Sequence, residues 1–173
     1  MNPFDMRTVV ITSAAIIFVC SLLLLMLWKQ NRGRFSGIGI WSAGFAAIAA
    51  GLSLLALRGV IPYVVSVFLA NVVIMSGVLL TIIGTDHFLG RTGRRVHDIL
   101  LLGLFSALFA RYVFVHDSLQ ARTALISILM TVYCAQIAWT LLARVGPDVR
   151  RWTFLTGLVY AAYTLINVIR LLR

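Results

Sequence analysis

Six long hydrophobic runs, separated by short polar segments, dominate the pattern of this chain. All of the runs except the fourth are close to the roughly 20 apolar residues that an α-helix needs to cross a hydrocarbon core of about 30 Å. The pattern therefore predicts an all-α fold, a polytopic membrane helix bundle with six transmembrane helices. Their expected bounds are 8–28, 36–57, 63–83, 98–115, 121–143 and 152–170.

The fourth run needs a separate argument because it is short. Its uninterrupted apolar part, from Ile99 to Ala110, would cover only about 18 Å as a helix, which is too little to cross the membrane. We therefore expect the helix to continue through Arg111 to Val115. This places Arg111 about one helical turn inside the bilayer.

The composition agrees with a membrane protein. Of 173 residues, 61% are hydrophobic and 12% are charged, and the mean hydropathy is +1.01. Six helices leave no room for a soluble catalytic domain. The net charge of +10 would suggest a nucleic-acid ligand in a soluble protein. Here the basic residues fall in short segments between apolar runs, so we expect membrane lipids as partners and no nucleic acid.

The basic residues also predict an orientation. The segments after the first, third and fifth runs each carry a group of them, and the positive-inside rule places these groups in the cytoplasm. They are Lys29, Arg32, Arg34, Arg91, Arg94, Arg95, Arg144, Arg150 and Arg151. The N-terminus is then expected outside, and after six spans the C-terminus lies outside as well.

Basic residues at helix ends on the expected outer side form a candidate ligand site. They are Arg58, Arg111, Arg122 and Arg170. A charge inside a span costs about 2.5–3.5 kcal/mol, and only Asp5 and Asp117 stand out there as partners. The guanidinium groups are thus candidates for binding a small anionic ligand, such as a carboxylate, a phosphate or a lipid headgroup. The alternative is that each arginine snorkels to the headgroups and caps its helix.

Four further polar residues complete the candidate site: Asn71, Tyr112, His116 and Ser127. A histidine such as His116 can titrate between about pH 5 and 8, although an ordinary interface role is the alternative. Asn71 lies near mid-membrane, where interhelical hydrogen bonding is the alternative to ligand binding.

No motif predicts catalysis, a cofactor or a metal. His87 and His97 flank one segment and would be the pair for a haem, but nothing else in the chain supports one. Histidines and cysteines are too scattered for zinc, and Cys20 and Cys134 lie in apolar runs as packing residues. We therefore expect no enzyme activity in this chain, no cofactor and no metal.

Three segments together resemble a known bacterial membrane module. They are GIGIWSAGFAAIAAGLSLLALRGVIP, with Trp41, Gly44, Gly51, Arg58, Gly59 and Pro62; SVFLANVVIMSGVLLTIIGTDHFLGR, with Ser66, Asn71, Gly77, Phe88, Gly90 and Arg91; and YVFVHDSLQARTALISI, with Tyr112, Arg122 and Ser127. WTLLAR follows them. The ordered set is similar to the N-terminal multi-helix sensor region found ahead of GGDEF diguanylate cyclase domains and of some histidine kinases.

The resemblance implies a sensor domain of the bacterial inner membrane that acts in signal transduction. Such a domain would sense a small ligand or lipid state near the periplasmic face. It would regulate a cytoplasmic diguanylate cyclase, which makes cyclic di-GMP, in a homodimer of the full-length protein. Relatives resemble seven-helix modules whose last helix leads inward. Residues 1–173 are therefore expected to be a fragment that lacks a seventh helix and the cytoplasmic output domain, and the alternative is a stand-alone relative.

Two other functions fit a small helix bundle. A transporter or channel subunit would need polar groups across the whole membrane, and Asn71 and Gln136 lie near its middle without an acidic residue or an internal repeat. A structural subunit of a larger membrane complex would agree with the short connecting segments.

Overall fold

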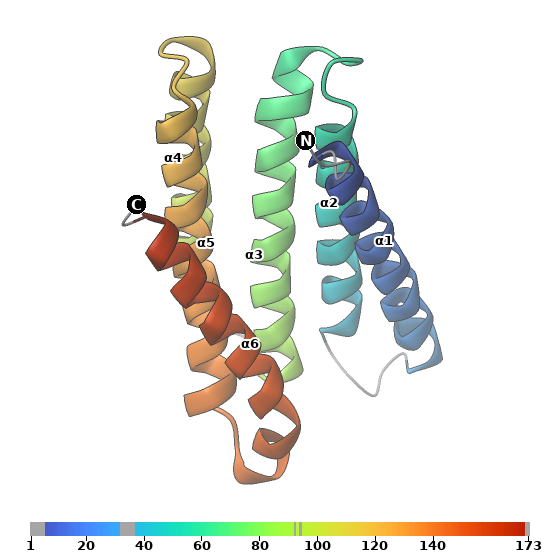
Figure 1. Ribbon diagram of the computed structural model, residues 1–173. Coiled ribbons are helices and arrows are strands. Elements are labelled where there is room, and N and C mark those ends of the chain that lie inside the picture. The colour runs from blue at the N-terminus through green and yellow to red at the C-terminus, as the bar shows by residue number, and fades with distance from the viewer. Residues whose placement is uncertain (1–5, 32–36, 92, 94, 172–173) are drawn as a thin grey trace. The chain divides into compact units, whose positions relative to one another are not determined.

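The computed structural model describes residues 6–31, 37–91, 93 and 95–171, and these residues form helices joined by short turns (Figure 1). The elements are α1 (Met6–Gln30), α2 (Ile38–Ala56), the π-helical segment η1 (Val64–Leu69), α3 (Ala70–Phe88), α4 (Val96–Phe114), α5 (Leu119–Ala143) and α6 (Pro147–Leu171). Within the described residues, 6 helices are long and apolar enough to cross a membrane, with η1 and α3 counted as one. This confirms the predicted all-α fold and indicates a multi-pass membrane protein.

Helix α4 follows the expectation drawn from its length. It runs through Arg111 and ends at Phe114. The backbone N–H groups of Val115 and His116 both donate to the Arg111 carbonyl, at 2.9 and 3.1 Å. The chain then turns, and α5 begins at Leu119 because Ser118 caps it, accepting the Ala121 N–H at 3.3 Å.

Helices α3 and α6 differ most from the predicted bounds, since each extends five residues further at one end. Helix α3 ends at Phe88 instead of 83, because its stop is set by Gly90 in the left-handed region (φ 72°). There the Arg91 N–H donates to the Asp86 carbonyl at 2.8 Å and the Gly90 N–H to the His87 carbonyl at 3.1 Å, which is a Schellman motif. Helix α6 begins at Pro147, since proline suits the first position of a helix. The predicted start of the second span, at position 36, lies outside the described residues, as do Asp5, Arg32, Arg34, Arg94 and Arg173.

The chain forms two compact units, 1–106 and 107–173, and the boundary falls within α4. In the first unit, α2 and α3 approach closely through glycines. A Cβ on Gly77 would lie 2.6 Å from the Gly44 carbonyl oxygen, and a Cβ on Gly44 would lie 2.9 Å from the Gly77 carbonyl oxygen. Side chains there would push the two backbones apart, so glycine is what permits this packing.

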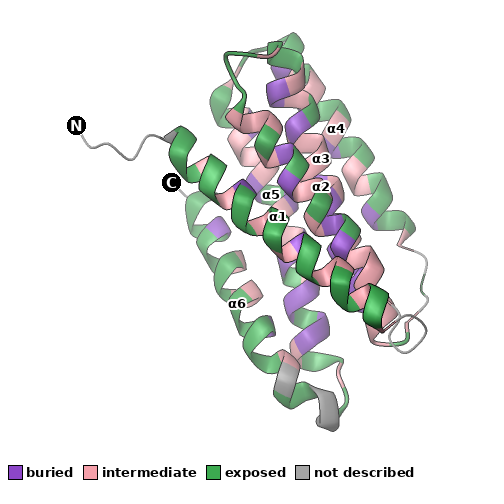
Figure 2. Ribbon diagram, turned by 90° about the vertical axis from the view of Figure 1, so that its right-hand side faces the viewer, coloured by how far each residue is buried: buried purple, intermediate pink, exposed green. Residues whose placement is uncertain are grey.

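Polar groups also connect the helices of the first unit. The Ser21 hydroxyl of α1 donates to the Ser42 carbonyl of α2 at 3.0 Å, and the Ser42 hydroxyl donates back to the Ser21 carbonyl at 3.1 Å. Both serines are buried. The Trp41 indole N–H donates to the Thr81 carbonyl at 3.1 Å and so joins α2 to α3. Figure 2 shows buried residues concentrated along α3 of this unit, whereas α1 is mostly exposed.

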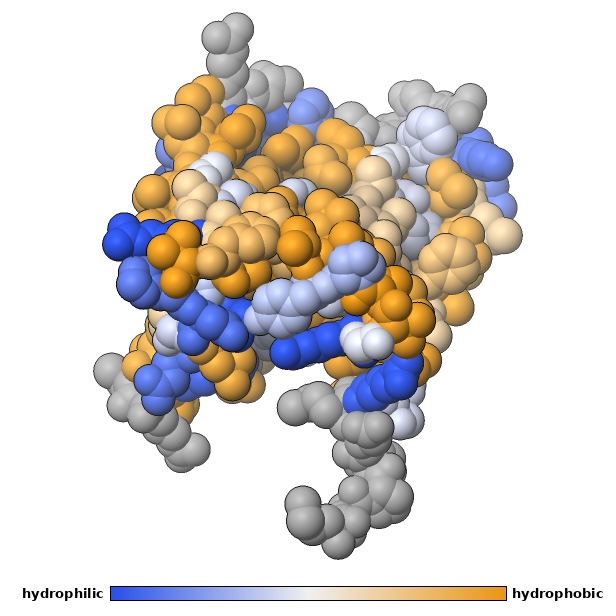
Figure 3. All heavy atoms as spheres, turned by 90° about the horizontal axis from the view of Figure 1, so that it is seen from above, coloured by the Kyte–Doolittle hydropathy of each residue, from blue (hydrophilic) through white to orange (hydrophobic). Residues whose placement is uncertain are grey.

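In the second unit, α5 packs on α6. A Cβ on Gly157 of α6 would lie 2.8 Å from the Leu142 side chain, so glycine again lets the helices approach. Tyr133 and Ile137 of α5 are buried. Large hydrophobic side chains remain exposed along α1, α4, α5 and α6, and many such residues reach the surface in the view along the helices (Figure 3). Exposed apolar side chains of this kind are expected where helices face lipid.

Candidate functional site

A pocket between α5 and α6 brings together two of the predicted site residues, Ser127 and Arg170. It has a volume of about 500 Å³ and lies entirely within the second unit. Its lining residues are Leu119, Gln120, Thr123, Ala124, Ser127, Arg170 and Leu171. We call this the α5–α6 pocket.

The α5 wall of the pocket is one polar face of an otherwise apolar helix. Gln120, Thr123 and Ser127 recur at spacings of three and four residues, so they lie above one another on the same side of the helix. Ser127 is 2% exposed, and it is one of the residues that line the pocket. No hydrogen bond from the Ser127 hydroxyl to another described residue is present.

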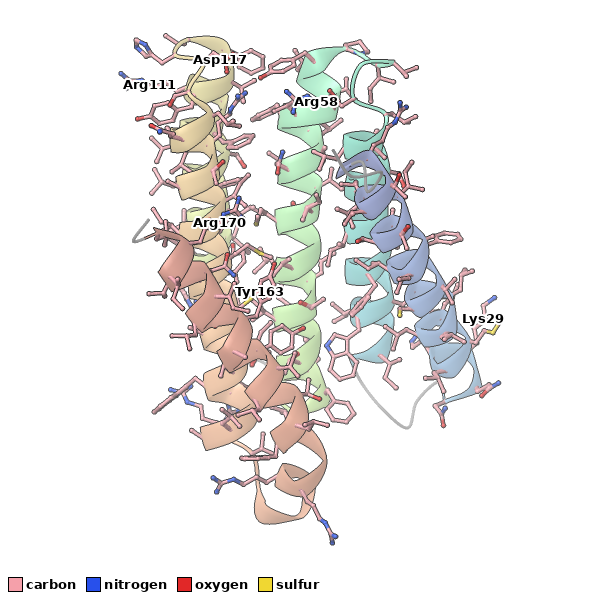
Figure 4. The ribbon with its side chains drawn as sticks, in the orientation of Figure 1. Lys29, Arg58, Arg111, Asp117, Tyr163 and Arg170 are labelled. Carbon is pink, nitrogen blue, oxygen red and sulfur yellow. The ribbon has the colours of Figure 1, made fainter. Side chains whose placement is uncertain are left out.

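The opposite wall is the C-terminal end of α6, which supplies Arg170. Figure 4 places Arg170 below the α4–α5 turn, where Arg111 and Asp117 lie. Arg170 lines the pocket together with the first turns of α5. These turns run from Leu119 to Ser127 and rise about 12 Å. Helix α5 has 25 residues and is about 37 Å long, which exceeds a hydrocarbon core of about 30 Å. The pocket at its first turns therefore lies near one end of a helix that is long enough to cross the core.

Arg122 has a different environment from Arg170. Its guanidinium is buried and pairs with the exposed Asp117 carboxylate at 2.9 Å. Asp117 was one of the two outer partners expected from the sequence. The pair joins the turn before α5 to the first turn of that helix, which is a structural role.

Arg111, Tyr112 and His116 lie at the end of α4 and in the turn that follows. Arg111 and His116 are exposed, and Tyr112 is half-buried. None of the three lines the α5–α6 pocket. An exposed arginine in the last turn of a helix favours the helix C-terminus electrostatically, which matches the capping alternative.

The two remaining predicted site residues belong to the first unit. Arg58 is exposed, and its guanidinium lies 5.7 Å from the centre of the Tyr63 ring, within the range of a cation–π contact. The Asn71 side chain donates to the Val67 carbonyl of η1 at 2.7 Å. Asn71 thus serves its own helix, satisfying a carbonyl in the wider π-helical turn.

A second polar cluster, which the sequence argument did not identify, lies where α3 meets α4 in the first unit. Arg95 Nε lies 2.6 Å from Asp86 Oδ2, and Arg95 Nη1 lies 3.1 Å from Asp98 Oδ2. His97 Nε2 also lies 3.1 Å from Asp98 Oδ2. The Asp98 side chain is 0% exposed. We call these four residues the Arg95 cluster.

The charge balance of the Arg95 cluster accounts for its burial. The hydrogen bond that Arg95 donates to the Asp86 carboxylate raises the pKa of Arg95 above its ordinary value, and burial opposes this rise in part. The guanidinium therefore stays charged and offsets the buried Asp98 carboxylate. Its place at the helix ends, and its full set of internal contacts, indicate that the cluster fixes the α3–α4 connection.

Gln120 and Thr123 were missed as site residues, although the signal was present. Helical spacing from Ser127 places both on its face, since Thr123 precedes it by four residues and Gln120 by seven. Among the described residues, no group of three or more His, Cys, Asp or Glu side chains is arranged to hold a metal ion. The chemistry that the α5–α6 pocket offers is therefore anion binding by one guanidinium, with hydroxyl and amide groups beside it.

Comparison of the chain with models of protein families, with curated proteins and with solved structures finds no match.

Proposed function

We propose that the chain is a signal-input module of the bacterial inner membrane, in which an anionic group binds Arg170 in the α5–α6 pocket. The observation that supports this is the composition of that pocket. The exposed Arg170 lines it together with three polar side chains of α5, including the buried Ser127. A polar pocket of this kind suits the phosphate of a lipid or the carboxylate of a small amphiphile.

Ligand binding between two helices can act as a signal because it changes the balance between two packings. A ligand shifts this balance only as far as it binds one packing more tightly than the other. Helices α5 and α6 approach closely at Gly157, whereas the pocket lies at the start of α5 and the end of α6. A ligand in the pocket would therefore change the angle between the two helices. The pocket then faces the periplasm, as the orientation expected from the basic residues requires.

The output is proposed from the sequence resemblance. It is a cytoplasmic diguanylate cyclase that follows the membrane module in a homodimer, and the module itself carries out no reaction. A change in helix packing would alter the spacing of the two cyclase domains and with it the synthesis of cyclic di-GMP.

The test uses the protein with its natural output domain, reconstituted in vesicles. Cyclic di-GMP synthesis is measured in phosphatidylglycerol vesicles and in phosphatidylcholine vesicles with and without added inorganic phosphate. Arg170→Gln is expected to weaken the response to the effective anion by about ten-fold or more, because a hydrogen bond to a charged group contributes roughly 1.5–3 kcal/mol. Ser127→Ala should weaken it less.

The matched control is Arg151→Gln, which removes the same charge from an exposed position at the other end of α6. It should respond like the wild type. A response to phosphatidylglycerol alone identifies a lipid headgroup as the ligand class, and a response to inorganic phosphate identifies a small anion. An unchanged response in Arg170→Gln, or no response of the wild type to either anion, would overturn the proposal.

A further inference from the structure

A second hollow lies in the first unit, between α1 and α2, and differs in character from the α5–α6 pocket. It has a volume of about 580 Å³, and 6 of its 11 lining residues are alanines. The lining residues are Arg7, Ile11, Ala14, Ala15, Phe18, Ala46, Ala49, Ala50, Ser53, Ala56 and Leu57. We call this the α1–α2 groove. Small side chains on both helices leave it open, and it is apolar except at the end where Arg7 lies.

The length of the α1–α2 groove matches one leaflet of a bilayer. From Arg7 to Phe18, α1 rises about 16 Å, which is close to half of a hydrocarbon core of about 30 Å. Phe18 and Ala46 line the inner end of the groove and also a second hollow that continues along the same helices to Trp28. The two hollows therefore meet near the middle of α1 and α2.

Positive charge gathers at the open end of the α1–α2 groove. The Arg7 Nε donates to the Ala56 carbonyl at 3.2 Å, which holds its guanidinium at the C-terminal end of α2. Arg58 is exposed two residues further along the chain. A guanidinium has five N–H donors, so one side chain can both cap a carbonyl and contact a phosphate.

We propose that the α1–α2 groove binds one acyl chain of an anionic phospholipid, with the phosphate held at Arg7. The apolar walls accept the chain, the depth of one leaflet sets its reach, and the cation at the open end selects the headgroup charge. This site lies in the other unit from the α5–α6 pocket and does not depend on the function proposed for that pocket.

A helix of a second copy is the competing occupant, since small residues also let helices approach closely. A phospholipid carries its own phosphate to Arg7, whereas a second copy offers few anions, since the chain has 5 acidic residues in all. Asp86, Asp98 and Asp117 already pair with basic side chains of their own copy. Charge complementarity thus favours a phospholipid over a second copy.

The test is native mass spectrometry of the full chain released from nanodiscs that contain equal amounts of phosphatidylglycerol and phosphatidylcholine with identical acyl chains. The wild type should retain one lipid, with phosphatidylglycerol in excess. Arg7→Gln should lower that excess by about five-fold, the factor expected for one basic residue at an anionic membrane surface. Arg151→Gln, an exposed charge change in the other unit, should leave it unchanged.

A second variant tests the groove itself. Ala50 is exposed and lines the groove, so Ala50→Phe fills it without crowding a core, and the retained lipid should be lost. Ala162→Phe, an equal change at an exposed position on α6, should retain it. The proposal is overturned if Ala50→Phe keeps its lipid, if Arg7→Gln keeps the wild-type lipid ratio, or if Ala50→Phe alters the fraction of dimer while lipid retention stays the same.

Discussion

Removing the guanidinium of the Arg95 cluster tests how the structure keeps a charge buried. In Arg95→Ala, the Asp98 carboxylate loses its contact at 3.1 Å, and the Asp86 carboxylate loses its contact at 2.6 Å. The Asp98 side chain is 0% exposed, so water cannot replace the lost partner without opening the α3–α4 connection.

The expected cost follows from that burial. Breaking a buried ion pair by removing one partner typically costs about 3–5 kcal/mol, because the remaining charge is left uncompensated. His97 keeps its contact with Asp98 at 3.1 Å, although the histidine side chain is 64% exposed. We therefore expect the lower end of the range, about 3 kcal/mol of unfolding free energy.

The assay is unfolding of the purified protein by SDS in mixed micelles, followed by circular dichroism. The double variant Arg95→Ala/Asp98→Asn should recover at least half of the loss, since it removes the buried charge together with its partner. Arg151→Ala, at an exposed position, should stay within about 0.5 kcal/mol of the wild type.

Two results would contradict this reasoning. One is an Arg95→Ala variant as stable as the wild type, and the other is a double variant no more stable than the single one. The raised pKa of Arg95 sets the sign of its pH dependence. A raised basic pKa means that the charge of Arg95 contributes fully below its ordinary pKa and is lost only as the pH rises beyond the folded value. The assay near neutral pH therefore measures Arg95 in its charged form.

Two further predictions concern helix packing, and the same unfolding assay measures both. Gly77→Ala should destabilise the protein strongly, because the new Cβ would lie 2.6 Å from the Gly44 carbonyl oxygen. In the control Gly103→Ala, the new Cβ has no described atom within 4 Å, so the change should be neutral or stabilising by up to about 1 kcal/mol. Equal effects of the two substitutions would contradict the close contact. Ser42→Ala should cost about 0.6 kcal/mol, the average for an interhelical hydrogen bond in a membrane protein, and a cost above about 2 kcal/mol would show that more than this bond depends on the side chain.

The hydrophobic pattern was sufficient for the number and type of helices, because length and apolarity are what the membrane requires of a span. Arg111 lies within α4 for the same reason, because the apolar run before it is too short to cross. The hydrophobic pattern predicted the ends of the helices less well. The end of α3 depends on a left-handed glycine, and a sequence with Gly84 and Gly90 does not show which of them adopts it.

The candidate site was predictable only in part, because the sequence shows the type of a residue more clearly than its neighbours. Ser127 and Arg170 do share a pocket, but Arg122 pairs with Asp117, and Asn71 bonds to its own helix. The Arg95 cluster was missed altogether. Its residues are charges near helix ends, where a solvated loop and a buried ion pair have the same sequence signature.

The π-helical segment η1 has a consequence for how this chain is compared with others. A π-helical turn holds more residues than an α-helical turn, so Val64–Leu69 accommodates extra chain length without rotating α3. Because η1 opens this helix after Tyr63, deleting one residue there would restore ordinary α-helical winding and leave the faces of α3 where they are. A one-residue gap in an alignment of this helix therefore belongs within Val64–Leu69, because a gap between Leu69 and Gly77 would turn the Gly77 face away from α2.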